Sequence, residues 1–99
     1  MPVYMIIDIQ INDEALYRQY VQRVPEVIGK YGGKYLARGG QVTPWSGSWN
    51  PQRIVLIEFE TMDHLRRCFE SAEYRQIAPL GRQSTIGRAV VVQGCAPAA

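Results

Sequence analysis

The sequence has little of the side-chain chemistry that metal and redox sites require. It contains one histidine, His64, and two cysteines, Cys68 and Cys95, which are far apart and form no C-x-x-C motif. No cysteine or carboxylate stands at metal-ligand spacing around His64, which argues against a zinc or iron site. We expect Cys68 to be a small buried side chain within a helix. Unpaired cysteines are typical of a reduced, cytoplasmic protein, and we expect neither a metal nor a cofactor.

Long apolar runs and a large charge of one sign are also missing. No segment approaches the ~20 apolar residues of a membrane-spanning helix. The pattern of a secretory signal, a positively charged start followed by an apolar stretch, is not visible. The formal net charge is only +2, and the arginines are scattered rather than gathered on one face, which argues against a nucleic-acid partner. We therefore predict a cytoplasmic protein that binds neither membrane nor nucleic acid.

The common catalytic and nucleotide-binding motifs are absent as well. There is no G-x-S-x-G motif and no phosphate-binding loop, and the pairs Gly32-Gly33 and Gly39-Gly40 lack the spacing of a dinucleotide fingerprint. Hydrophobic residues make up 46% and charged residues 20% of the chain, which is typical of a globular domain. We predict one domain over residues 1–99, with residues 94–99 as a flexible tail.

What the sequence does contain is an internal repeat, about fifty residues apart, of a strand followed by a helix. Residues 6–11 form an apolar segment that leads through a polar break into an amphipathic pattern, and residues 56–61 do the same. Each copy has one carboxylate at the same step, Asp8 in the first and Glu58 in the second. Such a repeat indicates architecture more strongly than a single motif, because both halves must bury the same kind of surface.

The boundaries of the elements follow from turn and cap residues. Strands are predicted over 3–11, 34–38, 53–60 and 87–94, and helices over about 13–31, 61–71 and 73–80. Asn12 is the expected N-cap of the first helix and Thr61 that of the second. Pro25 should kink or break the first helix, and Gly32-Gly33 should end it. Gly39-Gly40 predicts a bulge before the second strand resumes at 41–43.

The order β-α-β-β-α-β predicts an α+β fold of the ferredoxin-like type, with a four-stranded antiparallel sheet and helices on one face. The other face should then be polar, yet several strands are apolar on both sides, as in Val90-Val91-Val92. Soluble monomers rarely expose a contiguous apolar patch of several hundred square ångströms. We therefore predict a homodimer that packs sheet against sheet. The alternative is a monomer in which Trp45 and Trp49 fold over the sheet.

Several segments, taken in order, resemble one protein family. Residues 31–40, YGGKYLARGG, resemble the most recognisable stretch of the family called domain of unknown function thirteen-thirty, and residues 49–53, 57–59 and 71–75 are similar to it too. The resemblance covers essentially the whole chain and implies the fold and dimer of the dimeric α/β-barrel superfamily. That superfamily includes cofactor-independent monooxygenases, isomerases, decarboxylases, haem-using enzymes and ligand-binding proteins, and fold alone cannot choose among them. The loop 44–49, with its two tryptophans, departs from the family's usual turn.

Asp8 and Glu58 are the candidate catalytic residues. If the first and third strands are adjacent and parallel, the repeat places both carboxylates close together on one face. Two neighbouring carboxylates in a low-dielectric site raise each other's pKa, which suits acid–base catalysis. The structural alternative is that Arg38, Arg53 or Arg88, or the partner subunit, pairs with them in salt bridges.

The candidate ligand-binding residues are basic or aromatic. Arg38 ends a strand just before two glycines, where the backbone can approach a ligand and a guanidinium can hold an anion. Tyr74 and Arg82 lie on the late helical segment and could orient a polar ligand, whereas packing and solvent exposure are their plainer roles. Trp49 could stack on an aromatic ligand or anchor the dimer interface. The full set of candidates is Arg38, Arg53, Tyr74, Arg82 and Trp49.

The sequence thus predicts a homodimer that binds a small anionic or aromatic organic molecule between sheet and helices. One hypothesis is a cofactor-independent enzyme of the monooxygenase or isomerase type, with Asp8 or Glu58 as the base. The alternative is a non-catalytic ligand-binding or structural dimer module.

Overall fold

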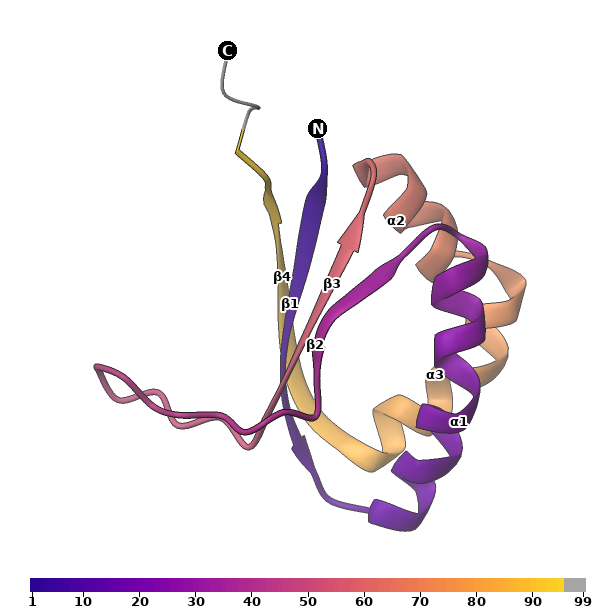
Figure 1. Cartoon of the computed structure of the whole chain (residues 1–99). Helices are drawn as coiled ribbons and strands as arrows, with labels where there is room; N and C mark the ends of the chain where they lie inside the picture. The colour runs from indigo at the N-terminus through magenta and orange to yellow at the C-terminus, as the bar shows by residue number, and fades with distance from the viewer. Residues whose placement is uncertain (96–99) are drawn as a thin grey trace.

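The computed structural model describes residues 1–95, which form a four-stranded sheet with helices on one side (Figure 1). The elements are β1 (Val3–Ile11), α1 (Glu14–Lys30), β2 (Lys34–Arg38), β3 (Arg53–Phe59), α2 (Met62–Phe69), α3 (Ala72–Ser84) and β4 (Thr85–Gln93). The strand order is β2-β3-β1-β4, and every neighbouring pair is antiparallel. The predicted ferredoxin-like α+β fold is confirmed.

The two central strands, β1 and β3, run antiparallel rather than parallel as predicted. The crossover through α1 brings β2 back in the direction of β1, and the chain then reverses between β2 and β3, so β3 must oppose β1. The register pairs Glu58 with Tyr4 and Asp8 with Ile54. Asp8 and Glu58 therefore share a face of the sheet but lie about 13 Å apart along the strands, at a rise of ~3.3 Å per residue.

The side of the sheet that faces the helices carries the hydrophobic core. Side chains alternate along each strand, so every second residue of β1 and β3 points toward the helices. Phe59, at 0% exposed, and Ile57, at 2%, are the most deeply buried of these strand residues. The buried cluster comprises Val3, Ile9, Val24, Ile28, Val55, Ile57, Phe59, Leu65, Cys68 and Ile77. The helices are thus held to the sheet mainly by apolar burial, which stabilises by roughly 25 cal/mol per Å².

The opposite side of the sheet, here called the open face, is apolar as predicted. Its aliphatic residues are Ile6, Ile54, Leu56, Ile86, Val90 and Val92, and beside them lie Tyr4, Asp8, Gln10, Lys34, Glu58 and Arg88. Within residues 1–95 no helix covers this face (Figure 1). Ile86 remains 66% exposed and Val90 62%, so the strand at this edge presents large apolar side chains to solvent.

Helix α1 differs from its prediction at two points. Its N-cap is Asp13 rather than Asn12, since the Asp13 carboxylate accepts a hydrogen bond from the N–H of Leu16 at 3.0 Å. A charged cap also complements the positive end of the helix dipole. The helix is not broken at Pro25, because the turn that follows buries Ile28 in the core, at 1% exposed, and this packing outweighs the one hydrogen bond that proline removes.

The end of α1 follows the sequence pattern. Gly33 donates to the carbonyl of Ile28 at 2.9 Å and Gly32 to that of Gly29 at 3.1 Å, which is the Schellman arrangement of a helix C-terminus. Gly32 has φ of 82°, a conformation that favours glycine. A Cβ on Gly33 would come within 2.9 Å of the Phe59 ring, so the turn also brings the backbone close to the core.

Four other features of the strands and helices were predicted wrongly. The bulge in β2 lies between Tyr35 and Ala37, not at Gly39-Gly40, and no strand resumes at 41–43. Helix α3 runs through Pro79 to Ser84 instead of ending near Leu80. The Ser84 hydroxyl donates to the carbonyl of Leu80 at 2.6 Å, so this carbonyl in the last turn of the longer helix has a hydrogen-bond partner. Strand β4 accordingly begins at Thr85, two residues earlier than expected.

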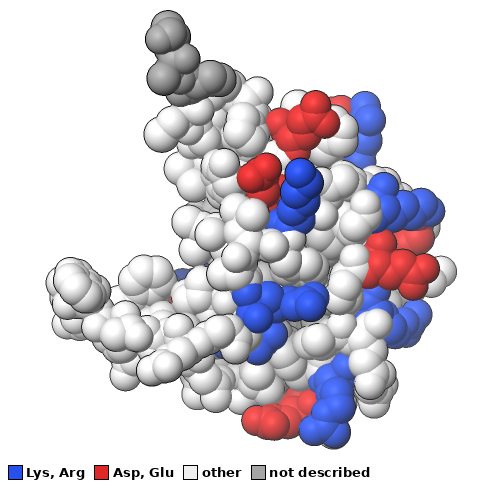
Figure 2. All heavy atoms as spheres, in the orientation of Figure 1, with Lys and Arg blue, Asp and Glu red and all other residues white. Residues whose placement is uncertain are grey.

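Residues 39–52, here called the arm, connect β2 to β3 and project from the open face, away from the helices (Figure 1). Trp45, near the tip, is 94% exposed. The arm contains no Lys, Arg, Asp or Glu, and in Figure 2 it consists of white atoms, whereas the charged side chains lie on the body. Of the alternative in which Trp45 and Trp49 fold over the sheet, the structure does not show the Trp45 part, whereas Trp49 does contact the open face through Asp8.

The flexible tail was predicted over residues 94–99, and residues 96–99 of it lie outside the described residues. Gly94 is described, and its N–H donates to the carbonyl of Pro2 at 2.8 Å. Over residues 1–95 no helix combines the length and the apolar character that crossing a membrane would need.

Candidate ligand-binding pocket

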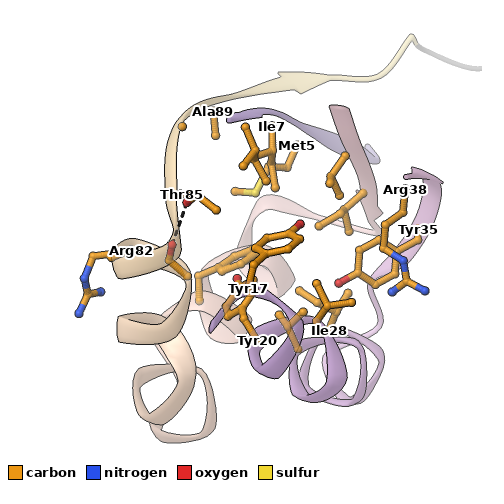
Figure 3. Close-up of a pocket in the computed structure, with 18 of the residues that line it drawn as sticks. Met5, Ile7, Tyr17, Tyr20, Ile28, Tyr35, Arg38, Arg82, Thr85 and Ala89 are labelled. Carbon is orange, nitrogen blue, oxygen red and sulfur yellow. Dashed lines mark hydrogen bonds between the residues drawn. The ribbon is translucent and has the colours of Figure 1, made fainter. Parts of the chain in front are cut away.

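A pocket of about 630 Å³ lies between the helix-facing side of the sheet and the helices (Figure 3). Met5, Ile7 and Ile9 of β1 line it on the sheet side. Residues of α1 and α3 line the opposite wall, and Gly87 and Ala89 of β4 lie at its edge. Binding sites for small organic molecules usually measure roughly 300–1,000 Å³ and are lined mainly by apolar and aromatic side chains. The pocket meets both criteria.

Four tyrosines line this pocket: Tyr17, Tyr20, Tyr35 and Tyr74. The rings of Tyr17 and Tyr20 point into the cavity (Figure 3), with their centroids 6.2 Å apart. The hydroxyls of Tyr20 and Tyr74 lie 2.9 Å apart and share a hydrogen bond. Phe69 holds the Tyr74 ring edge-on at 4.8 Å between centroids. The result is a fixed hydroxyl pair in an otherwise apolar pocket.

Burial raises the pKa of two of these tyrosines, Tyr20 and Tyr35. It raises the pKa of Tyr20 far above its ordinary value of 10.0, and the neighbouring Tyr74 hydroxyl adds to the effect. The pKa of Tyr35 is also raised by burial, although the nearby Arg38 opposes this shift. At neutral pH the Tyr20 and Tyr35 hydroxyls therefore act as neutral groups that can donate a hydrogen bond to an oxygen of a bound molecule or accept one from its hydroxyl.

Two of the predicted ligand-binding arginines lie at the rim of the pocket. Arg38 pairs across the sheet with Val55 on the helix-facing side, and its guanidinium lies 4.3 Å from the centroid of the Tyr35 ring. Because Glu58 points to the open face, the predicted salt bridge between Arg38 and Glu58 is wrong. Arg82 also lines the pocket, but its guanidinium turns away from the cavity (Figure 3).

Arg53 supports the pocket wall from outside. Its guanidinium lies 5.5 Å from the centroid of the Tyr17 ring and packs against Gly39, where a Cβ would come within 2.9 Å of Nη1. Its Nε is buried and has no hydrogen-bond partner among the described residues. Gly39, with φ of 77°, is thus required both by its backbone conformation and by the arginine beside it.

The predicted catalytic residue Asp8 lies on the open face, on the other side of the sheet from this pocket. Its Oδ2 accepts hydrogen bonds from Trp49 Nε1 at 2.9 Å and from Arg88 Nε at 3.1 Å. Asp8, Trp49 and Arg88 line a second, polar pocket of about 570 Å³ at the base of the arm. The structural alternative for Asp8, a salt bridge to Arg88, is confirmed.

Glu58 stands apart from Asp8 and lines neither pocket. In the register it lies opposite Tyr4 on one side and Lys34 on the other. The predicted juxtaposition of the two carboxylates is therefore wrong, because it depended on parallel central strands. Of the predicted ligand-binding residues, Arg38, Tyr74 and Arg82 line the first pocket and Trp49 lines the second, whereas Arg53 lies beside Tyr17 without lining either.

The scarce histidine and cysteines occupy ordinary structural positions. Thr61 caps α2 as predicted, and its hydroxyl lies 2.7 Å from Nδ1 of His64. Burial raises the pKa of the Cys68 thiol to about 11, which keeps it in the less reactive protonated form. Cys95 is exposed. Among residues 1–95 no three His, Cys, Asp or Glu side chains come together in a way that could hold a metal ion.

Of the four tyrosines that line the pocket, the sequence interpretation singled out Tyr74 and missed Tyr17, Tyr20 and Tyr35. A usable signal was present. Tyr17 and Tyr20 lie three residues apart on one side of a helix, and buried tyrosine hydroxyls usually find a polar partner.

The comparison with known families agrees with these observations. The profile of the domain of unknown function DUF1330 matches residues 2–95. No protein with a curated description matches the sequence. The chain therefore belongs to the DUF1330 family, as its resemblance to that family predicted.

Solved structures with the same fold come from several bacteria. A protein of unknown function from Rhodopseudomonas palustris has a TM-score of 0.75 at 14% identity, covering 97% of this chain and 84% of that one. SnoaB, a cofactor-independent oxygenase from Streptomyces nogalater, has a TM-score of 0.68 at 12% identity, with 97% and 95% covered. A dimeric protein of unknown function with a ferredoxin-like fold from Bacteroides fragilis has a TM-score of 0.63 at 12% identity, with 94% and 96% covered. At these identities the likeness shows the fold alone.

Proposed function

We propose that this member of the DUF1330 family is a cytoplasmic homodimer that binds a small aromatic molecule with an anionic or carbonyl oxygen. The binding site is the tyrosine-lined pocket of about 630 Å³. The observation that carries the proposal is the hydrogen-bonded pair of Tyr20 and Tyr74 hydroxyls, 2.9 Å apart, inside an apolar cavity between sheet and helices.

The lining of the pocket selects the class of molecule. The rings of Tyr17 and Tyr20 offer faces and edges on which a flat ring can pack, and such aromatic pairs add about 0.5–1.5 kcal/mol to simple burial. The hydroxyl pair offers hydrogen bonds to an oxygen of the bound molecule. Arg38 of β2, on the side of the pocket away from β4, offers a positive charge to an anionic group there.

The dimer part of the proposal rests on the open face. Its exposed aliphatic residues include Ile86, Val90 and Val92, a set that soluble monomers rarely leave uncovered. A twofold pairing through one shared face removes this surface from water in both copies. The dimeric Bacteroides fragilis protein, which has the same fold, supports this arrangement.

A second candidate function is a cofactor-independent enzyme acting on the same bound molecule. The fold is shared with the cofactor-independent oxygenase SnoaB, and the hydroxyl pair could hold a substrate oxygen while its charge changes. In this version Tyr20 and Tyr74 take the place that Asp8 and Glu58 had in the sequence-based hypothesis, because neither carboxylate lines the pocket.

Binding can be tested with a panel of aromatic carboxylates, phenols and ketones, screened by saturation-transfer NMR and quantified by calorimetry. Tyr74→Phe should weaken the best binder about tenfold, because it removes one hydrogen bond of about 1–1.5 kcal/mol from the site. Arg18→Gln, on the exposed side of α1, is the matched surface control and should change nothing. A panel without binders, or a binder that is indifferent to Tyr74→Phe, would refute the pocket assignment.

Turnover separates the two candidate functions. The best binder is incubated with the protein and a metal chelator while oxygen consumption and product formation are followed. Turnover that is lost in Tyr74→Phe beyond its effect on binding supports the enzyme. Tight binding without turnover supports the non-catalytic module.

A further inference from the structure

The arm has a fixed direction although its tip is exposed. Three contacts hold its base to the sheet: Trp49 Nε1 donates to Asp8 at 2.9 Å, the Ile11 N–H donates to Gln52 Oε1 at 2.7 Å, and Gly39 packs against Arg53. These contacts come from both ends of the arm. They hold the arm pointing away from its own open face (Figure 1).

The arm is long in comparison with the thickness of a sheet dimer. From Gly39 to Trp45 an extended chain spans about 20 Å, at ~3.3 Å per residue. Two sheets that pack face to face lie only about 10 Å apart. In a dimer through the open face, the tip of each arm therefore passes beyond the partner's sheet and reaches the partner's helix side.

Strand β4 is the surface that such an arm would meet. It is an edge strand, and its residues are exposed on both faces: Val90 on the open face at 62% and Val91 on the helix-facing side at 36%. Proteins usually cover an exposed apolar edge. Within residues 1–95 nothing lies over it. The same edge forms one side of the tyrosine-lined pocket through Gly87 and Ala89.

Twofold symmetry offers two ways to stack these sheets, with the axis along the strands or across them. Only an axis along the strands places the β2 side of one sheet, where the arm begins, over the β4 edge of the other, since the strand order is β2-β3-β1-β4. That arrangement covers both exposed edges at once. The other arrangement leaves both β4 edges uncovered and directs both arms away from them.

We propose that Trp45 of one copy crosses the β4 edge of its partner and closes the partner's tyrosine-lined pocket. Each binding site is then composite: the hydroxyl pair comes from one copy and the closing indole from the other. The indole adds an apolar wall against which a flat aromatic ligand packs. The arm has no charged side chain, so it can lie against this apolar edge without burying an unpaired charge. This inference rests on the proposed dimer and pocket.

The test replaces Trp45 with the photoreactive amino acid benzoylphenylalanine in the full chain. Protein grown on ¹⁵N is mixed with unlabelled protein under conditions that exchange subunits, irradiated and digested. Crosslinked peptides are then identified by mass spectrometry. The proposal expects crosslinks that join chains of opposite label, with position 45 attached to residues 82–91 at the mouth of the pocket. Benzoylphenylalanine in place of Arg66, on the exposed side of α2, is the control and should not reach that region.

Sedimentation of the same samples shows whether a missing crosslink contradicts the proposed role of Trp45 or the proposed dimer. A monomer overturns both proposals. A dimer in which position 45 attaches within its own chain, attaches elsewhere or gives no crosslink overturns the closing role of Trp45 and leaves the dimer standing.

A second measurement uses the native tryptophan. The emission that Trp45→Phe removes from the parent protein is that of Trp45, and iodide should quench this part several-fold less in the dimer than after dilution to monomer. In Trp45→Phe the remaining Trp49 serves as the reference. Quenching of Trp45 that is equally strong at every protein concentration would contradict the proposal.

Discussion

The two faces of the sheet are built from the same strands but differ in burial and in the residues they present. The helix-facing side combines a buried core with a pocket that four tyrosines line. The open face combines exposed aliphatic residues with the Asp8–Arg88–Trp49 cluster. The two carboxylates predicted to be catalytic, Asp8 and Glu58, lie on the open face, whereas the pocket suited to a ligand lies on the helix-facing side of the sheet. Charge alone is therefore a poor guide to the binding site of this chain.

The largest expected effect comes from truncating the helix-facing core. Phe59→Ala should lower the free energy of unfolding by about 3–5 kcal/mol, because it leaves a cavity beneath packed helices. Urea denaturation at several protein concentrations measures this loss, which should be the same at each concentration. A loss that grows on dilution would mean that Phe59 contributes to the interface instead.

The matched change on the open face is Val90→Asp. It should leave the fold intact but raise the dimer dissociation constant about 100-fold or more, since an unpaired charge buried in an interface costs around 3 kcal/mol. Sedimentation equilibrium measures the shift, with circular dichroism as the check on folding. Val90→Thr, which keeps the β-branched shape, is the milder control. An unchanged dimer would place the interface elsewhere.

Asp8→Asn tests the polar cluster of the open face. The amide keeps the shape but loses the charge that holds Arg88 and Trp49, and charge-assisted hydrogen bonds contribute roughly 1.5–3 kcal/mol. We expect lower stability and a shifted, broadened Trp49 indole N–H signal in NMR spectra, with ligand affinity in the pocket unchanged. Loss of turnover without these changes would restore Asp8 as a catalytic candidate.

The smallest effect concerns pH and belongs to the pocket. The pKa of Tyr20 is raised in the folded protein above its ordinary 10.0, so above pH 10 the unfolded chain releases a proton that the folded chain keeps. Its contribution to stability is complete below pH 10 and falls above it, by at most about 1.4 kcal/mol per pH unit. Urea unfolding of Tyr20→Phe between pH 9 and 11 should show a shallower fall than the parent protein. Equal slopes would contradict the raised pKa.

Much of the architecture was predictable because it depends on local chemistry. The repeat predicted the strand–helix units, Gly32 predicted the end of α1, and Thr61 predicted the start of α2. The errors arose where packing overrides local preference. Pro25 does not break α1, and α3 continues through Pro79, because burial of neighbouring side chains in the core outweighs one missing hydrogen bond.

The candidate site was less predictable because it depends on strand direction. Because β3 runs opposite to its predicted direction, Glu58 lies about 13 Å from Asp8 along the strands, at ~3.3 Å per residue, instead of beside it. Arg38, Tyr74 and Arg82 were predicted and do line the pocket, but the pairing of Tyr20 with Tyr74 joins residues 54 positions apart. No local pattern contains such a contact.

By itself, the sequence determined the order of the elements, the apolar character of both sheet faces and the family to which the chain belongs. These properties follow from side-chain periodicity and from cap and turn residues, which act over a few positions. Only the tertiary structure decided which face holds the pocket, which hydroxyls meet inside it and where the arm points. Those properties depend on strand register and on contacts between residues distant in the chain, and they exist only once the helices have packed on one side of the sheet.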